Sequence, residues 1–222
     1  MTGAALFDVD GTLVDSTYLH VVTWSRTFLE AGLTVSNARI HRAIGMSGTR
    51  MLAWLLGEDE ARRVEATVTP RHSELFLDQI GSLRPTPGAR ELIAYLVEHG
   101  VRVVLATSAA PEEREALLRV LDLPVPVAAI TDASDVDESK PDPELLHIAL
   151  SRVDTDPRGS TMVGDARWDM QAALRAEVVG IGVRCGGLSE DELLAAGASA
   201  VFDDPGALLE AVDTSPLAAL LP

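Results

Sequence analysis

Cysteine, lysine and aromatic residues are scarce in this chain of 222 residues. The one cysteine, Cys185, excludes an intramolecular disulfide and a zinc site built from several cysteines. No apolar run approaches the ~18 residues that span a bilayer. The first residues also lack the basic segment of a signal peptide. We therefore expect a soluble protein of the cytoplasm.

Acidic residues outnumber basic residues by 34 to 18, which gives a net charge of −16. This charge repels nucleic acids and anionic membrane surfaces, so we expect neither as a partner. Hydrophobic residues make up 47% of the chain, a proportion typical of a globular protein. The length indicates one or two domains, and the sequence does not distinguish a monomer from a homodimer.

Lys140 is the only lysine among the 18 basic residues. A GC-rich bacterial genome would favour arginine in this way, which explains the scarcity of lysine without any function. An ammonium group is nevertheless compact where a guanidinium is broad and planar. A single lysine in such a chain is therefore a candidate for a special role.

The apolar pattern predicts an α/β protein with an inserted helical part. Residues 15–83 are expected to form an all-helical cap domain, because the stretch is helical, lacks a strand and is too long for an ordinary crossover. Residues 1–14 and 84–222 are expected to form a Rossmann-like core, in which strands alternate with helices around a parallel sheet. The expected strands are 4–8, 101–106, 127–130, 160–163, 178–183 and 200–202. The expected helices are 16–31, 47–56, 60–80, 89–99, 111–121, 143–153, 168–176 and 205–212.

Acidic and hydroxyl side chains follow several of the predicted strands. Asp8 and Asp10 come after the first strand, and Thr107 and Ser108 come after the next one in the chain. Asp165 follows the strand 160–163, with Asp169 shortly after it and Lys140 in an earlier loop. Because ligands bind beyond the carboxyl ends of parallel strands, we expect these side chains to meet at one edge of the sheet.

Such a set of side chains can support phosphoryl transfer. Clustered carboxylates repel one another unless a cation lies between them, and oxygen ligands of this kind suit Mg²⁺. Lys140, Thr107 and backbone N–H groups near Gly11 are candidates for holding phosphoryl oxygens. An aspartate can act as a nucleophile, and Asp10 could exchange the proton of the leaving oxygen. Each fragment alone also has an ordinary interpretation as a turn or a helix cap, and the joint placement favours the site.

The motifs Asp8-Val9-Asp10-Gly11-Thr12, Thr107, Lys140-Pro141 and Gly164-Asp165-x-x-x-Asp169 resemble those of the haloacid dehalogenase superfamily. The helical stretch resembles the cap of its phosphoglycolate phosphatase and β-phosphoglucomutase branch. The resemblance implies that a small phosphorylated metabolite is hydrolysed through an aspartyl-phosphate. Asp8 would be the nucleophile and Asp10 the general acid and base, while Thr107 and Lys140 would contact the phosphoryl group. Mg²⁺ would be held by Asp8, the Asp10 carbonyl and Asp165, with Asp169 acting through water or beside the ligands.

Three alternatives to a phosphatase remain. A dehalogenase is disfavoured because relatives of that kind lack an acid that matches Asp10. A β-phosphoglucomutase is favoured by the resemblance around His20 and disfavoured by Ile44, because those mutases carry a lysine just before the cap glycine, here Gly45. A regulatory protein that keeps the fold is the third alternative.

Substrate contacts from the cap are the least determined part of the sequence. His20, Arg50 and Arg71 are candidates, since a guanidinium matches the geometry of an anionic group. An ordinary position on a helix surface is an equally good interpretation of each. Gly11 and Ser108 are the candidates for substrate binding from the core. Trp24, Trp54 and Met46 are interpreted as residues of the cap core.

Overall fold

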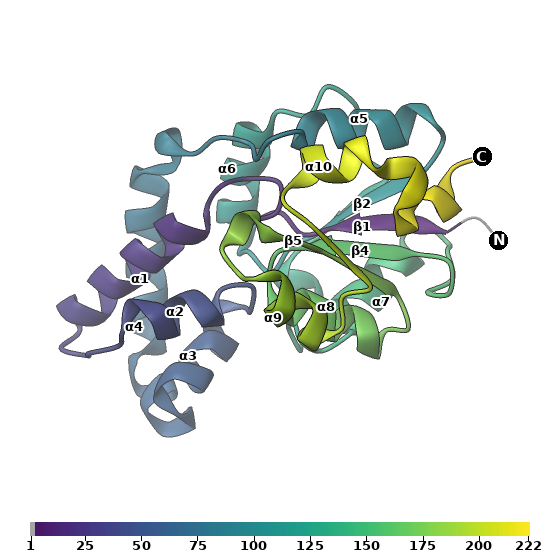
Figure 1. Cartoon of the computed structure of the whole chain (residues 1–222). Coiled ribbons are helices and arrows are strands. Elements are labelled where there is room, and N and C mark those ends of the chain that lie inside the picture. The colour runs from purple at the N-terminus through teal and green to yellow at the C-terminus, as the bar shows by residue number, and fades with distance from the viewer. Residues whose placement is uncertain (1–2) are drawn as a thin grey trace.

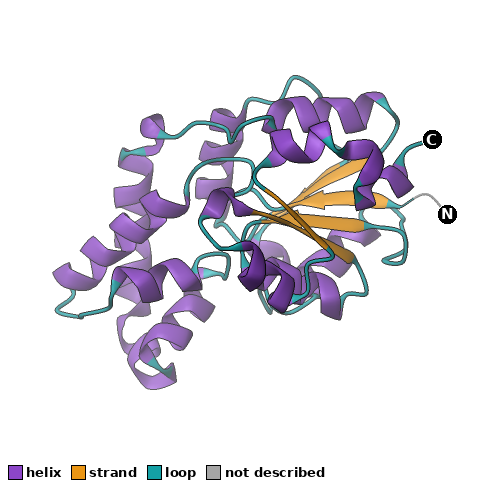
Figure 2. Ribbon diagram, in the orientation of Figure 1, coloured by secondary structure: helices purple, strands orange, loops and turns teal. Residues whose placement is uncertain are grey.

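The computed structural model describes residues 3–222, so residues 1 and 2 of the predicted core lie outside it. Six parallel strands form one sheet in the order β3-β2-β1-β4-β5-β6 (Figures 1 and 2). The strands are β1 (Ala4–Phe7), β2 (Arg102–Ala106), β3 (Ala129–Thr131), β4 (Thr161–Gly164), β5 (Val179–Val183) and β6 (Ala200–Phe202). The sheet confirms the predicted α/β class.

Strand β1 lies at the centre of the sheet, between β2 and β4. All four of its residues are buried, as expected for a strand that is covered on both faces. The chain order of the strands runs outward from β1 to β2 and β3 on one side, and from β4 to β6 on the other. This reversal next to β1 leaves a crevice at the carboxyl ends of the strands, where open α/β sheets bind ligands.

Helices cover both faces of the sheet (Figure 2). Apolar side chains of α5 (Ala89–Glu98), α6 (Pro111–Leu121) and α10 (Pro205–Glu210) pack on one face. Those of α7 (Glu144–Ser151) and α8 (Arg167–Arg175) pack on the other face.

Four further helices, here named the cap helices, lie beside the sheet between β1 and α5 (Figure 1). They are α1 (Thr17–Glu30), α2 (Asn37–Ala43), α3 (Gly48–Leu56) and α4 (Glu58–Asp78). The two segments that connect the cap helices to the core lie side by side. They are joined by a hydrogen bond in which the Asp15 N–H donates to the Arg84 carbonyl at 2.9 Å. The division into two domains at residues 14/15 and 83/84 stays a prediction. No described helix is long and apolar enough to cross a membrane.

The sequence analysis missed two short helices, α2 and α9 (Glu190–Ala196). Each begins after a serine whose hydroxyl accepts a backbone N–H, Ser36 for α2 and Ser189 for α9. In α9, Glu192 also accepts the Ser189 N–H, which completes a capping box. The Ser189-x-x-Glu192 pattern is visible in the sequence and is typical of the start of a helix.

Trp168 links the core to the cap helices. It lies on α8, yet its buried ring packs into the cluster formed by Trp24, Ile40 and Leu52 of the cap helices. Its indole N–H donates to the Arg42 carbonyl at 3.0 Å, so the polar end of the ring is also satisfied.

We expect Trp168→Ala to lower the free energy of unfolding by about 3–5 kcal/mol, because it opens a cavity between α8 and the cap helices. Denaturant unfolding followed by circular dichroism measures the change. Leu174→Ala is the matched control on the same helix, since the Leu174 side chain is 65% exposed, and it should change stability by less than about 0.5 kcal/mol. Equal effects of the two substitutions would contradict the packing role of Trp168.

Candidate active site

The only lysine lies at the centre of the predicted site. Lys140 is fully buried, and its Nζ lies 2.6 Å from Asp8 Oδ1 and 2.8 Å from Asp169 Oδ1. It also donates to the Ala106 carbonyl at 2.8 Å, where β2 ends. One compact ammonium group thus joins side chains that follow β1 and β4, and a planar guanidinium would not fit these three acceptors.

Asp8, Asp165 and Asp169 form an acidic cluster in which one carboxylate oxygen of each lies within 4.8 Å of the others. Asp165 Oδ1 accepts the Thr12 hydroxyl at 2.9 Å. Gly186 faces the other oxygen so closely that an added Cβ would lie 1.7 Å from Asp165 Oδ2. The backbone therefore leaves room for this carboxylate only because residue 186 lacks a side chain.

Burial and mutual repulsion raise the pKa values of two acids in the cluster. Burial is the largest cause for Asp8, whose pKa rises to about 7 although Lys140 opposes the shift. Burial and the charges of Asp169 and Asp8 raise the pKa of Asp165 well above its usual range. Burial opposes protonation of Lys140, but Asp169 and Asp8 outweigh it and raise the pKa of the ammonium. The single positive charge of Lys140 does not neutralise the charge of three buried carboxylates.

The acidic cluster fits a divalent cation. Asp8 Oδ2 is buried and has no hydrogen-bond partner among residues 3–222, so a ligand oxygen is available there. The three carboxylates supply only oxygen, which is the donor type that Mg²⁺ prefers. Asp169 is the least available of the three, because its Oδ2 already accepts the Ala166 N–H at 3.0 Å and its Oδ1 contacts Lys140.

Thr107 and Ser108 lie where β2 ends and α6 approaches. Thr107 Oγ1 accepts the Ala109 N–H at 3.0 Å and lies 3.5 Å from Asp10 Oδ2. The buried Ser108 hydroxyl has no partner among the described side chains and backbone, and it lines a cavity in front of Asp8. The Gly11 N–H already donates to the Val14 carbonyl and the Ser16 hydroxyl, so it is not free for a substrate.

His20 reaches the site from α1. Its Nε2 lies 3.0 Å from Asp10 Oδ1, and the Ser16 hydroxyl donates to the same oxygen at 2.7 Å. Burial opposes protonation of His20, but Asp10 outweighs it and raises the pKa of the imidazole. The structure thus brings His20 to Asp10, and its imidazole also lines the cavity in front of Asp8.

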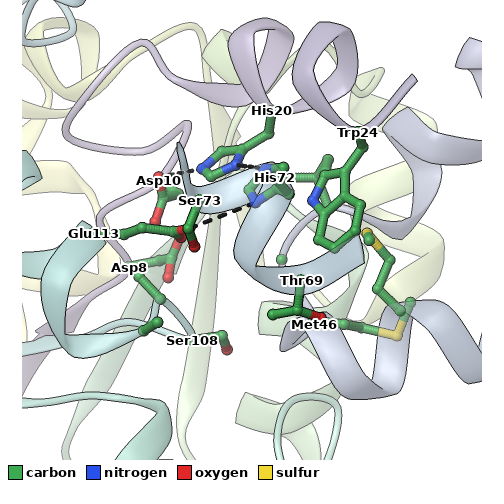
Figure 3. A pocket seen from close by; sticks show the side chains of 16 residues that line it. Asp8, Asp10, His20, Trp24, Met46, Thr69, His72, Ser73, Ser108 and Glu113 are labelled. Atoms are coloured by element: carbon green, nitrogen blue, oxygen red, sulfur yellow. Dashed lines mark hydrogen bonds and ion pairs between the residues drawn. The ribbon is translucent and has the colours of Figure 1, made fainter. Parts of the chain in front are cut away.

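This cavity of about 90 Å³, here named the central cavity, lies between the core and the cap helices (Figure 3). Trp24 and Met46 lie on the side of the cavity opposite Asp8 and Asp10 (Figure 3), and Met51 also lines it. Trp24 and Met46 are buried, as predicted, but they also face this space. Trp54 is not a core residue, since it is 42% exposed.

The structure does not bring Arg50 or Arg71 into the central cavity. The Arg71 guanidinium is bound to Glu30 and Glu74 in a different hollow. Arg50 donates to Glu138 and to the Ser139 carbonyl, beside the neighbouring hollow that Trp54 lines. No arginine or lysine is among the described residues that line the central cavity.

The sequence analysis missed His72 and Glu113, both buried at the edge of the central cavity. His72 lies on α4 and contacts His20, while Glu113 lies on α6 and contacts His72. Burial lowers the pKa of His72. Burial opposes ionisation of Glu113, but the two histidines outweigh it and lower its pKa to about 2. A histidine and a glutamate within amphipathic helices gave no separate signal in the sequence.

We expect Lys140→Met to lower the free energy of unfolding by about 3–5 kcal/mol in EDTA, because Asp8 and Asp169 lose their buried counter-ion. Denaturant unfolding measures the loss. Arg158→Met is the control: it breaks the ion pair with Glu177, in which the arginine side chain is 81% exposed, and should cost less than about 1 kcal/mol. If the Lys140 variant is no less stable than this control, the ammonium does not hold the site together.

Comparisons with known proteins agree with this fold. Residues 5–183 match the model of the haloacid dehalogenase-like hydrolase family. The chain is similar to a phosphoglycolate phosphatase of Rhodospirillum rubrum, at 29% identity over 92% of this chain and 88% of the relative. It is also similar to the probable phosphatase IndB of Dickeya dadantii, at 31% identity over 91% and 90%.

A solved structure of a hydrolase from Pseudomonas syringae superposes with a TM-score of 0.89, at 33% identity over 96% of this chain and 98% of that one. The family match spans both the strand ends that carry Asp8, Thr107 and Asp165 and the inserted cap helices. The chain belongs to the haloacid dehalogenase-like hydrolase family.

Proposed function

We propose that this protein is a Mg²⁺-dependent phosphatase that hydrolyses a small phosphomonoester through an aspartyl-phosphate. The observation that carries the proposal is the arrangement around Asp8, where one oxygen is held by Lys140 and the other is buried without a partner. Such a carboxylate is fixed in place and keeps one oxygen available for a ligand or a phosphorus atom. The similarity to two phosphatases supports the same reaction class.

In the proposed reaction, a carboxylate oxygen of Asp8 attacks phosphorus and the bond to the leaving oxygen breaks. Asp10 gives a proton to that oxygen, so that the leaving group departs as an alcohol. Water then attacks the phosphorus of the aspartyl-phosphate, and Asp10 takes a proton from it. This second step releases phosphate and restores both carboxyl groups.

The remaining core residues have proposed roles in binding. Asp8, Asp165 and the Asp10 carbonyl would hold Mg²⁺, which when bound offsets the repulsion between the carboxylates and the substrate phosphate. Asp169 would act beside these ligands by holding Lys140, since both of its oxygens are engaged. Thr107 and Ser108 would contact the phosphoryl oxygens, and the unpartnered Ser108 hydroxyl supports its part in this role. Lys140 would hold the Asp8 carboxylate in place, and it would contact a phosphoryl oxygen only by giving up one of its three contacts to Asp8, Asp169 and the Ala106 carbonyl.

The lining of the central cavity also indicates what charge the leaving group can carry. Its wall opposite the acids consists of apolar and hydroxyl side chains, without arginine or lysine among its described residues. A carboxylate or a second phosphate on the substrate would lie there without an arginine or lysine to pair with it, which is costly in a buried site. The cavity therefore favours an uncharged leaving group, such as that of a sugar phosphate, over a phosphoglycolate-like one.

The same wall disfavours the mutase alternative. A phosphosugar mutase must hold a second phosphate while it moves the first, and this requires positive charge. Here Ile44 lines the cavity, just before Gly45, at the position where the mutases that this chain resembles carry a lysine. Hydrolysis needs no such group.

We expect phosphate release from p-nitrophenyl phosphate with Mg²⁺ and its loss in EDTA, with recovery on adding Mg²⁺ back. Asp8→Asn should lower turnover by at least about 10³-fold, because an amide cannot form the acyl-phosphate. A colorimetric phosphate assay measures both effects, and a circular dichroism spectrum checks that the variant is folded. Full turnover in EDTA, or a fully active Asp8→Asn variant, would contradict the proposal.

We expect kcat/KM for 2-hydroxyethyl phosphate to exceed that for phosphoglycolate by about tenfold or more, because the two esters differ chiefly in the carboxylate that the cavity cannot pair. Steady-state kinetics with both esters measures the ratio. Met46→Arg supplies a cation at the wall and should shift the ratio toward phosphoglycolate. A wild-type preference for phosphoglycolate would show that a cationic group reaches the substrate.

A further inference from the structure

The carboxylate of Asp165 is held from three sides by neighbouring segments of the core. Thr12 donates its hydroxyl to Asp165 Oδ1 at 2.9 Å. Two glycines lie close to the other oxygen: an added Cβ would lie 2.4 Å from Asp165 Oδ2 at Gly11 and 1.7 Å from it at Gly186. Because a packed interior leaves no slack at such distances, the positions of these two backbone segments determine where the carboxylate lies.

Gly186 ends a short 3₁₀ turn, Arg184–Gly186, that follows β5 and is here named the Gly186 turn. The φ angle of Gly186 is not positive, so the backbone conformation there does not itself require glycine. The feature of this position that excludes a side chain is the close approach to Asp165. The Gly186 turn therefore acts as one wall of the space that the Asp165 carboxylate occupies.

Two aromatic rings of the cap helices lie against the Gly186 turn. His41 on α2 donates from Nε2 to the Gly186 carbonyl at 2.8 Å, since a carbonyl oxygen can only accept. The His41 ring stacks on Tyr18 of α1, with centroids 5.3 Å apart and planes 7° from parallel. Tyr18 also reaches the next residue of the core, because an added Cβ at Gly187 would lie 2.4 Å from the Tyr18 hydroxyl oxygen.

The cap helices and the core leave almost no space between them on this side of Asp165. A cavity of about 10 Å³ is lined by Asp165 from the core and by Thr17 and His41 from the cap helices. The central cavity, in contrast, has a volume of about 90 Å³. A space of ~10 Å³ holds one water molecule at most. His41 is therefore placed to act on the backbone beside Asp165, and it has no room to contact a substrate there.

We propose that His41 and Tyr18 are positioning residues for the metal site. They hold the Gly186 turn against Asp165 and so keep its carboxylate in the place from which it would hold Mg²⁺. This inference rests on the proposed Mg²⁺-dependent function. Replacing a residue that orients a metal ligand typically weakens metal binding by about 10- to 100-fold. Here the orienting contacts come from the cap helices, so the affinity of the core for Mg²⁺ depends on how the cap helices lie against it.

His41→Phe tests this contact, because phenylalanine keeps the ring beside Tyr18 and removes the donor to the Gly186 carbonyl. We expect the Kd for Mg²⁺ to rise about tenfold, measured by isothermal titration calorimetry without any substrate. His41→Gln should recover most of the affinity, because its amide N–H can donate to the same carbonyl. A His41→Phe variant that binds Mg²⁺ as tightly as the wild type would overturn the proposal.

His99→Phe is the matched control. His99 also contacts a backbone carbonyl, that of Tyr95 at 2.7 Å, and its ring also stacks on a tyrosine, again Tyr95. It lines neither of the two cavities, so the Kd for Mg²⁺ should not change. The free energy of unfolding in EDTA is measured for both variants. If His41→Phe lowers that free energy but keeps the wild-type Kd, the role of His41 is merely structural and the proposal is wrong.

Gly186→Ala tests the same link from the core, without any change in the cap helices. Because φ at this position suits alanine, the substitution adds only a methyl group against Asp165 Oδ2. We expect the Kd for Mg²⁺ to rise at least as much as in His41→Phe. Unchanged affinity in Gly186→Ala would show that the carboxylate does not depend on the Gly186 turn, which contradicts the proposal.

Asp165→Asn separates a failure of this inference from a failure of the proposed function. It should weaken Mg²⁺ binding more than any of the variants above, because it removes the charged ligand itself. If the wild type binds no Mg²⁺, or if Asp165→Asn binds it equally well, the proposed metal site is wrong and the inference fails with it. If Asp165→Asn weakens binding while His41→Phe and Gly186→Ala do not, the inference alone is wrong.

Discussion

The buried ammonium of Lys140 is the interaction on which the site depends. It neutralises part of an acidic cluster that would otherwise be too costly to bury, and its three acceptors come from segments that follow β1, β2 and β4. The parallel sheet brings those segments together, and the ammonium allows them to stay together. Burial and the neighbouring carboxylates still raise the pKa values of Asp8 and Asp165, so a further negative charge at the same place is disfavoured.

The positions of Asp8, Thr107, Asp165 and Lys140 could be predicted from the sequence because they depend on local rules. Strand ends in a parallel sheet share one edge, and a lone lysine in an arginine-rich chain is conspicuous. The α/β class was confirmed for the same reason, since it follows from the alternation of short apolar strands and helices. The catalytic and binding roles of these residues stay predictions.

Contacts between helices could not be predicted in the same way. Arg71 was a reasonable substrate contact on a helix surface, but Glu30 on α1 and Glu74 on its own helix bind its guanidinium instead. His72 and Glu113 gave no signal, because their meeting depends on how α4 lies against α6. The sheet register determines which side chains lie next to one another at strand ends. The neighbours of a side chain on a helix depend instead on how the helices pack.

The wall of the central cavity has a consequence for how this protein can diverge. Ile44, Met46 and Met51 come from one short stretch of the chain, whereas the carboxylates and Lys140 come from distant segments of the core. Substitutions in that stretch can reshape the space for the leaving group without touching the acidic cluster. These three wall residues and the acidic cluster thus come from separate parts of the chain, so a substitution among residues 44–51 changes the shape of the cavity and leaves the carboxylates in place.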